Sequence, residues 1–83
     1  MSRRPLEIGP AGERTALAIE RARAARGLAQ RQLADRVTEL GRSMSNTMLS
    51  RIERRQRRCD VDDLVVISAA LGVSPLALLH GTP

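Results

Sequence analysis

Residues 30–54 read QRQLADRVTELGRSMSNTMLSRIER, and this stretch decides the fold. From residue 30 to about residue 39 its apolar residues recur at the spacing of one helix face, and the pattern stops at Gly41. Beyond that glycine, either Ser43 or Ser45 can cap a helix that runs to about residue 54. The stretch therefore predicts two amphipathic helices joined by a connection.

The two faces of the second helix in this stretch differ in chemistry. Met48, Leu49 and Ile52 lie on the side that is expected to face a core. The opposite side carries four polar residues, Asn46, Thr47, Ser50 and Arg51. A helix with one apolar and one polar face is expected to lie on the surface with its polar side outward.

A further helix is expected before this stretch, from Glu13 to Arg26. That segment contains no Gly or Pro, is rich in Ala and ends before Gly27, a residue that suits a left-handed helix terminus. Residues 1–12 hold two Pro and two Gly without a consistent periodicity, and they predict a flexible arm. The folded domain is accordingly expected to span residues 13–83.

Two more helices are expected after the deciding stretch. Asp60 and Asp63 have the spacing of a helix cap and its N3 carboxylate, ahead of the apolar run 64–71. Because that run contains one polar residue, its helix is expected to be central and buried nearly all round. Ser74 and Pro75 then open a short last helix. Five helices and no alternating strand pattern place the chain in the all-α class.

The composition limits the chain to one small domain with an aliphatic core. Its 83 residues include no Phe, Trp or Tyr, and a chain of this length buries only about three fifths to two thirds of the surface that its unfolded form exposes. All 14 basic residues are Arg, and the net charge is +5. Residues 51–58 hold five Arg and one Glu, which is +4 of that excess. Such a run predicts either a solvated helix face and loop or a surface for nucleic acid.

The single Cys and the single His support no catalytic or metal site. Cys59 cannot form an internal disulfide, and we interpret it as incidental rather than as a redox sensor. His80 has no second ligand candidate close in sequence, so no metal, no cofactor and no enzymatic activity are expected. No apolar run of signal-peptide length follows Met1, which predicts a cytoplasmic protein without a membrane segment.

Three motifs follow one another along the chain, and together they carry a resemblance. They are Gln30-Arg31-Gln32-Leu33-Ala34, Leu49-Ser50-Arg51-Ile52-Glu53 and Leu71-Gly72-Val73-Ser74. In this order they resemble the Cro/cI-like phage-repressor helix-turn-helix family, often called XRE, over roughly residues 15–82. The resemblance implies a five-helix lambda-repressor-like DNA-binding domain. It also implies a transcription regulator that binds an inverted-repeat operator in double-stranded DNA as a homodimer.

The resemblance also implies roles for individual residues. The implied base contacts are Asn46, Thr47, Ser50 and Arg51, and Asn and Arg are the side chains best suited to read adenine and guanine in the major groove. The expected contacts to the DNA backbone are Gln30, Arg42, Ser45, Arg54, Arg55, Arg57 and Arg58. Arg23 and Glu53 match a pair that joins the first helix of the family to the third.

Two features depart from the family's pattern. Seven residues, 38–44, separate Val37 from Ser45, whereas the family usually joins these helices by a short turn. Either the first helix of the pair runs a turn longer or the connection bulges. Arg55 stands where the family tends to place Gly, and a positive φ is unfavourable for a residue with a side chain. A different turn is therefore expected there.

The apolar side chains of the last helix bear on assembly. Leu76, Leu78 and Leu79 are expected to lie partly in a two-fold interface, because so small a chain does not need all of them for its core. An alternative function uses the same fold as an antitoxin or partner-binding module, with a toxin covering this surface. A toxin-like reading frame next to the gene would distinguish the two.

Overall fold

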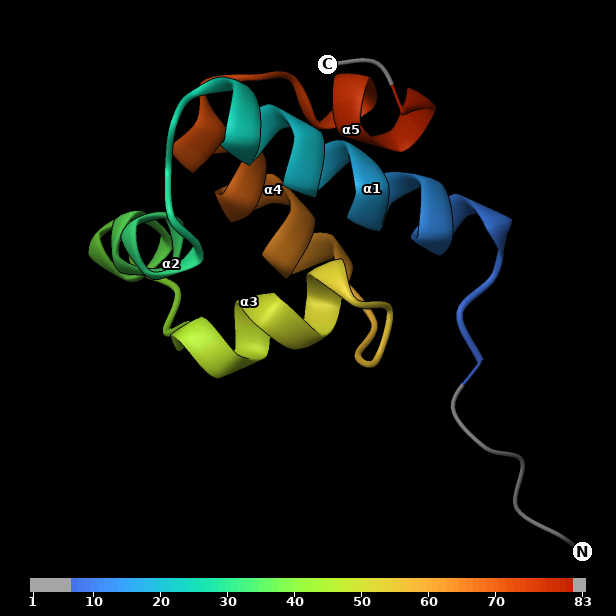
Figure 1. Cartoon of the computed structure of the whole chain (residues 1–83), viewed down its shortest axis with the longest axis horizontal. Coiled ribbons are helices and arrows are strands. Elements are labelled where there is room, and N and C mark those ends of the chain that lie inside the picture. Colours follow the sequence, from blue (N-terminus) through green and yellow to red (C-terminus); the bar gives the residue numbers. More distant parts are fainter. Residues whose placement is uncertain (1–6, 82–83) are drawn as a thin grey trace, which may run out of the picture.

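The computed structural model describes residues 7–81, and these residues form five α-helices without a strand. The helices are α1 (Pro10–Ala25), α2 (Gln30–Glu39), α3 (Asn46–Glu53), α4 (Val61–Leu71) and α5 (Pro75–His80). Figure 1 shows α1 crossing the molecule, with α5 on one side of it and α3 on the other. The all-α class predicted from the sequence is confirmed.

Aliphatic side chains from all five helices form the core. The largest apolar residues that are fully buried are Ile19, Leu33, Val37, Leu49, Ile52, Ile67 and Leu78. Each helix contributes at least one of them, so the domain has a single shared core rather than separate helix pairs. Within α3, burial of Leu49 and Ile52 fixes which side of the helix remains outside.

The central helix α4 packs against α1, α2 and α5, but it is not buried all round. Val61 and Val65 on its outer side are 74% and 49% exposed. The expectation of nearly complete burial is therefore wrong, because one face of α4 is enough to close so small a core. Its capping is as predicted, since Asp60 accepts a hydrogen bond from the Asp63 N–H and Asp63 accepts one from the Asp60 N–H.

The first helix begins three residues earlier than the predicted start at Glu13. Pro10 occupies its first turn, where the missing N–H of proline costs nothing. Residues 10–12 are thus helical and do not belong to an arm. The rest of the proposed arm lies mostly in residues 1–6, which are outside the described residues. At the other end α1 stops before Gly27, which has a φ of 65° as predicted.

The connection between α2 and α3 spans residues 40–45. Helix α2 ends at Glu39, so the extra residues lie in a bulged connection and not in another helical turn. Of the two possible caps for α3, Ser45 is the one used, because its Oγ accepts a hydrogen bond from the Met48 N–H at 3.1 Å. Helix α3 therefore begins with a capping side chain although the connection before it is long.

Arg55 ends α3 in a left-handed conformation, with a φ of 62°. Its N–H donates to the Ile52 carbonyl at 3.1 Å, and the Gln56 N–H donates to the Arg51 carbonyl at 2.8 Å. This pair of bonds is the helix-ending pattern that glycine usually serves. The expectation of a different turn is wrong, because the chain keeps the turn and accepts the strain of a side chain at positive φ.

We expect Arg55→Gly to raise the free energy of unfolding by about 0.5–1 kcal/mol, because glycine adopts positive φ without a steric penalty. Arg54→Gly is the matched control, since Arg54 has a φ of −84° that suits any residue. The control should lower the stability slightly. Chemical denaturation of the two variants compares them, and equal effects from both would contradict a strained Arg55.

Candidate nucleic-acid interface

The outer side of α3 is polar and open to solvent. Asn46, Thr47 and Arg51 are exposed, and Ser50 is half-buried. Within residues 7–81, the side chain of Arg51 forms no hydrogen bond or ion pair. The four residues with an implied role in base contacts thus lie together on one accessible helix face, with unpaired donors and acceptors available to a ligand.

A bidentate ion pair joins α1 to the end of α3. Arg23 Nε lies 2.8 Å from Glu53 Oε2, and Arg23 Nη2 lies 2.9 Å from Glu53 Oε1. The side chain of Glu53 is only 2% exposed, and that of Arg23 is 16% exposed. The hydrogen bond to Glu53 raises the pKa of Arg23 above its ordinary value. The structure therefore brings these two residues together as the sequence interpretation expected.

Gln30 and Leu28 complete this polar contact. Gln30 Nε2 donates to Glu53 Oε1 at 3.0 Å, and Arg23 Nη1 donates to the Leu28 carbonyl at 2.8 Å. Gln30 was expected to contact the DNA backbone, but here its amide anchors the start of α2 to the end of α3. Side chains from α1, α2 and α3 thus meet in one polar contact that links the start of α2 to the end of α3.

Two of the expected phosphate contacts, Arg42 and Arg57, have partners inside the protein. Arg42 Nε donates to Asp63 Oδ1 at 2.7 Å, and Arg57 Nη2 lies 3.7 Å from Asp63 Oδ2. Arg42 also lies 3.2 Å from Asp60. The bond to Asp63 raises the pKa of Arg42 above its ordinary value. Both guanidinium groups thus have carboxylate partners inside the protein, the one for Arg42 close and the one for Arg57 more distant.

Cys59 lies beside this cluster of charges. Burial, strengthened by the nearby Asp63 and Asp60 carboxylates, raises the pKa of its thiol to about 12. The thiol is therefore protonated near neutral pH, and a protonated thiol is a poor nucleophile and a poor redox sensor. This environment agrees with the interpretation of Cys59 as incidental rather than as a redox sensor.

The other basic residues and Ser45 lie at the two ends of α3. Arg54 and Arg55 are exposed at its C-terminal end, and within residues 7–81 their side chains form no hydrogen bond or ion pair. Arg58 is exposed as well, and its Nε donates to the Glu7 carbonyl at 3.1 Å. Ser45, at the opposite end, is exposed and caps the helix.

The three leucines that were expected in a dimer interface occupy different environments. Leu78 is fully buried, so it belongs to the core and cannot line an interface. Leu76 and Leu79 are 61% and 36% exposed. Helix α5 has only six residues, and so short a helix does not reveal from its sequence which of its leucines faces inward. Exposed apolar side chains also occur at Leu40, Val61 and Val65, which were not predicted to be exposed.

The structure also limits two other kinds of site. None of the helices formed by residues 7–81 is both long and apolar enough to cross a membrane. Over the same residues, no group of three or more His, Cys, Asp or Glu side chains could hold a metal ion.

Two short helices that pack around a shared core, with the second one exposing a polar face, define a helix-turn-helix protein. A family model described as helix-turn-helix matches residues 19–78. The chain thus belongs to this family, that of the XRE or Cro/cI-like DNA-binding transcription regulators.

A similar solved structure agrees with this assignment. The fold is similar to that in the crystal structure of the clp gene regulator ClgR from C. glutamicum, with a TM-score of 0.76 and 27% sequence identity. The similarity covers 94% of this chain and 90% of that chain. No curated protein matches the chain in sequence.

Proposed function

We propose that the protein binds an inverted-repeat operator as a homodimer and thereby regulates transcription. The observation that carries this proposal is the exposed face of α3, where Asn46, Thr47 and Arg51 point away from a fully buried Leu49 and Ile52. Asn can read adenine and Arg can read guanine through paired hydrogen bonds in the major groove. ClgR, the similar solved structure, is itself described as a gene regulator.

The contacts to DNA phosphates are assigned to the basic residues that remain accessible. Arg54 and Arg55 directly follow the last residue of α3 and are exposed, and Arg58 lies shortly after them. Ser45 lies at the other end of α3 and is also exposed. Such contacts set the position of the helix in the groove without reading sequence. Arg42, Arg57 and Gln30 are left out of this assignment because carboxylates already hold them.

Selection of bound sites from random duplex DNA with the purified protein tests the proposal. We expect an enriched motif with two-fold symmetry, whose half-sites are about one helical turn apart or a multiple of that distance. The same selection with Arg51→Ala serves as the control and should lose preference at one position of each half-site. Failure of the wild-type protein to enrich any motif would contradict sequence-specific binding.

We expect the protein to be a dimer at micromolar concentration, because an inverted-repeat site requires a two-fold symmetric protein. Leu76 is the best exposed apolar side chain of α5, so Leu76→Asp should shift the sedimentation coefficient to that of a monomer. Leu40→Asp is the matched control, since Leu40 is similarly exposed but follows α2, and it should leave the dimer intact. A wild-type monomer would favour the alternative in which another protein covers α5.

A further inference from the structure

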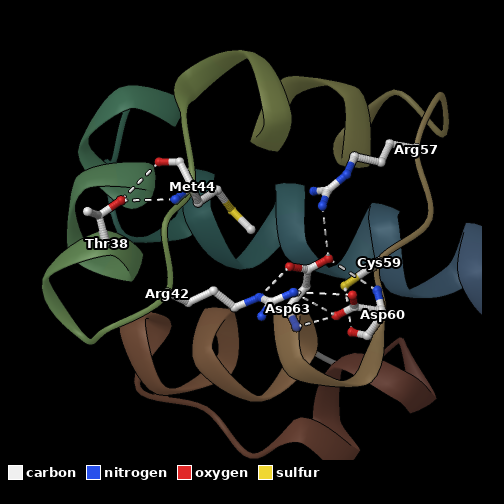
Figure 2. A network of polar contacts seen from close by, with 7 residues as sticks. All are labelled: Thr38, Arg42, Met44, Arg57, Cys59, Asp60 and Asp63. Carbon is white, nitrogen blue, oxygen red and sulfur yellow. Dashed lines mark hydrogen bonds and ion pairs between the residues drawn. The ribbon is translucent and has the colours of Figure 1, made fainter.

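One buried carboxylate contacts both chain segments that flank α3. The side chain of Asp63 is fully buried at the start of α4. Arg42, which comes before α3, donates to it from Nε at 2.7 Å, and Arg57, which comes after α3, reaches it at 3.7 Å. Figure 2 shows the two arginines approaching Asp63 from opposite sides. The two ends of α3 are thus tied to a single point on α4.

A second contact, between Thr38 and Met44, bridges the two ends of the bulged connection before α3. Thr38 Oγ1 donates to the Met44 carbonyl at 3.0 Å and accepts from the Met44 N–H at 3.1 Å (Figure 2). Met44 is only 4% exposed, so the end of the connection is anchored in the core. Between Thr38 and Met44, Arg42 also contacts Asp60 at 3.2 Å. A connection of this length is therefore held at both ends and at its middle.

The polar contacts to Asp63 on α4 are important because α3 itself packs mainly against α1 and α2. Its position relative to α4 depends on the segments before and after it. Removing Arg42 would leave the buried Asp63 with the Asp60 N–H and a long contact to Arg57, and a buried carboxylate that has lost its closest cation is unfavourable. The chain would then rearrange around Asp63, and both segments that flank α3 would be free to move.

We infer that Asp63, Arg42 and Thr38 are positioning residues that set the orientation of α3 for base recognition. The inference rests on the proposed function, and it explains how the chain tolerates a connection longer than the family's usual turn. It also replaces the expected role of Arg42 as a phosphate contact. Arg42 could bind a phosphate through Nε only by giving up its 2.7 Å hydrogen bond to the buried Asp63 carboxylate.

The test compares Arg42→Gln with Thr38→Val, which removes the hydroxyl and changes no charge. Arg21→Gln is the matched control for lost charge, because Arg21 is an exposed arginine of α1. It lies on the same face of α1 as Arg14, whose side chain contacts α5 rather than α3. Affinity for the selected site and for a scrambled duplex is measured over a salt series with the full chain.

We expect both Arg42→Gln and Thr38→Val to weaken binding to the selected site roughly tenfold, comparable to one mismatched base pair. Binding to the scrambled duplex and the salt dependence should stay as in the wild type and in Arg21→Gln. Equal weakening on both duplexes by Arg42→Gln, with a salt slope flatter by about 0.9 per lost contact, would make Arg42 a phosphate contact and overturn the inference. Wild-type specificity in Thr38→Val would overturn it as well.

Hydrogen exchange of the free protein provides a readout that does not require DNA. Amides of residues 40–48 should exchange faster in Arg42→Gln, Thr38→Val and Asp63→Asn, while amides in the middle of α1 should be unchanged. Exchange at wild-type rates in all three variants would overturn the inference. If exchange is faster in the variants but the wild-type protein binds no DNA, Asp63, Arg42 and Thr38 do position α3, and the proposed function is wrong.

Discussion

Arg23→Ala is expected to lower the free energy of unfolding by about 3–5 kcal/mol, the range for breaking a buried ion pair by removing one partner. The reason is the negative charge of Glu53, which would lose its partner. Glu53 keeps its carboxylate in the interior, where its side chain is 2% exposed and only the Gln30 amide still donates to it. The loss therefore exceeds what the pair itself contributes.

Two comparisons separate this effect from the loss of a surface charge. Arg21→Ala removes an exposed arginine from the same helix and should cost less than about 0.5 kcal/mol. A double variant, Arg23→Met with Glu53→Leu, removes both charges and should recover most of the stability. Chemical denaturation gives all three values. A loss below about 0.5 kcal/mol in Arg23→Ala would mean that water already screens the pair.

Leu78→Ala is expected to destabilise the protein by about 2–5 kcal/mol, because it opens a cavity in a core that is small and purely aliphatic. Leu76→Ala on the same helix is the matched control. Leu76 is 61% exposed whereas Leu78 is 0% exposed, so the control should change the stability of the monomer by less than about 0.5 kcal/mol.

Denaturation at several protein concentrations distinguishes the two leucines further. The loss in Leu78→Ala should not depend on concentration, because the cavity lies inside each chain. Any effect of Leu76→Ala should appear only where the wild-type protein is dimeric, since the dimer itself adds stability by mass action. A concentration-dependent loss in Leu78→Ala would place this residue in an interface after all.

The features that could be predicted from the sequence are those encoded by neighbouring residues. Asp60 with Asp63, and Ser74 with Pro75, mark the beginnings of α4 and α5, and the structure uses both. Gly27 and Gly41 mark helix ends, and both have positive φ. A cap or a left-handed terminus depends on a few adjacent residues, so a single sequence is sufficient to locate it.

The features that could not be predicted depend on contacts between distant segments. Asp63 was predicted as a capping residue, and nothing in its neighbourhood indicates that Arg42 would be its partner. The burial of Leu78 and the exposure of Val65 likewise depend on how α4 and α5 pack, which helical spacing leaves open. Arg55 was identified as a departure from the family, but only the structure shows that the turn is kept despite the side chain.

The proposed function divides two roles: α3 reads bases, and the basic residues after it hold phosphates. Its most direct test is the affinity of Arg51→Ala and Arg54→Ala for the selected site and for a scrambled duplex, measured over a salt series. Arg54 represents the phosphate contacts because it is exposed at the end of α3, whereas Arg57 is held by Asp63.

We predict that Arg51→Ala loses about 1–3 kcal/mol on the selected site only and relaxes the preference at one base pair per half-site. Arg54→Ala should weaken both duplexes alike and flatten the salt slope by about 0.9 per lost phosphate contact, or nearly twice that in a dimer. The opposite pattern, with Arg51→Ala weakening both duplexes equally and Arg54→Ala changing base preference, would contradict this account of α3.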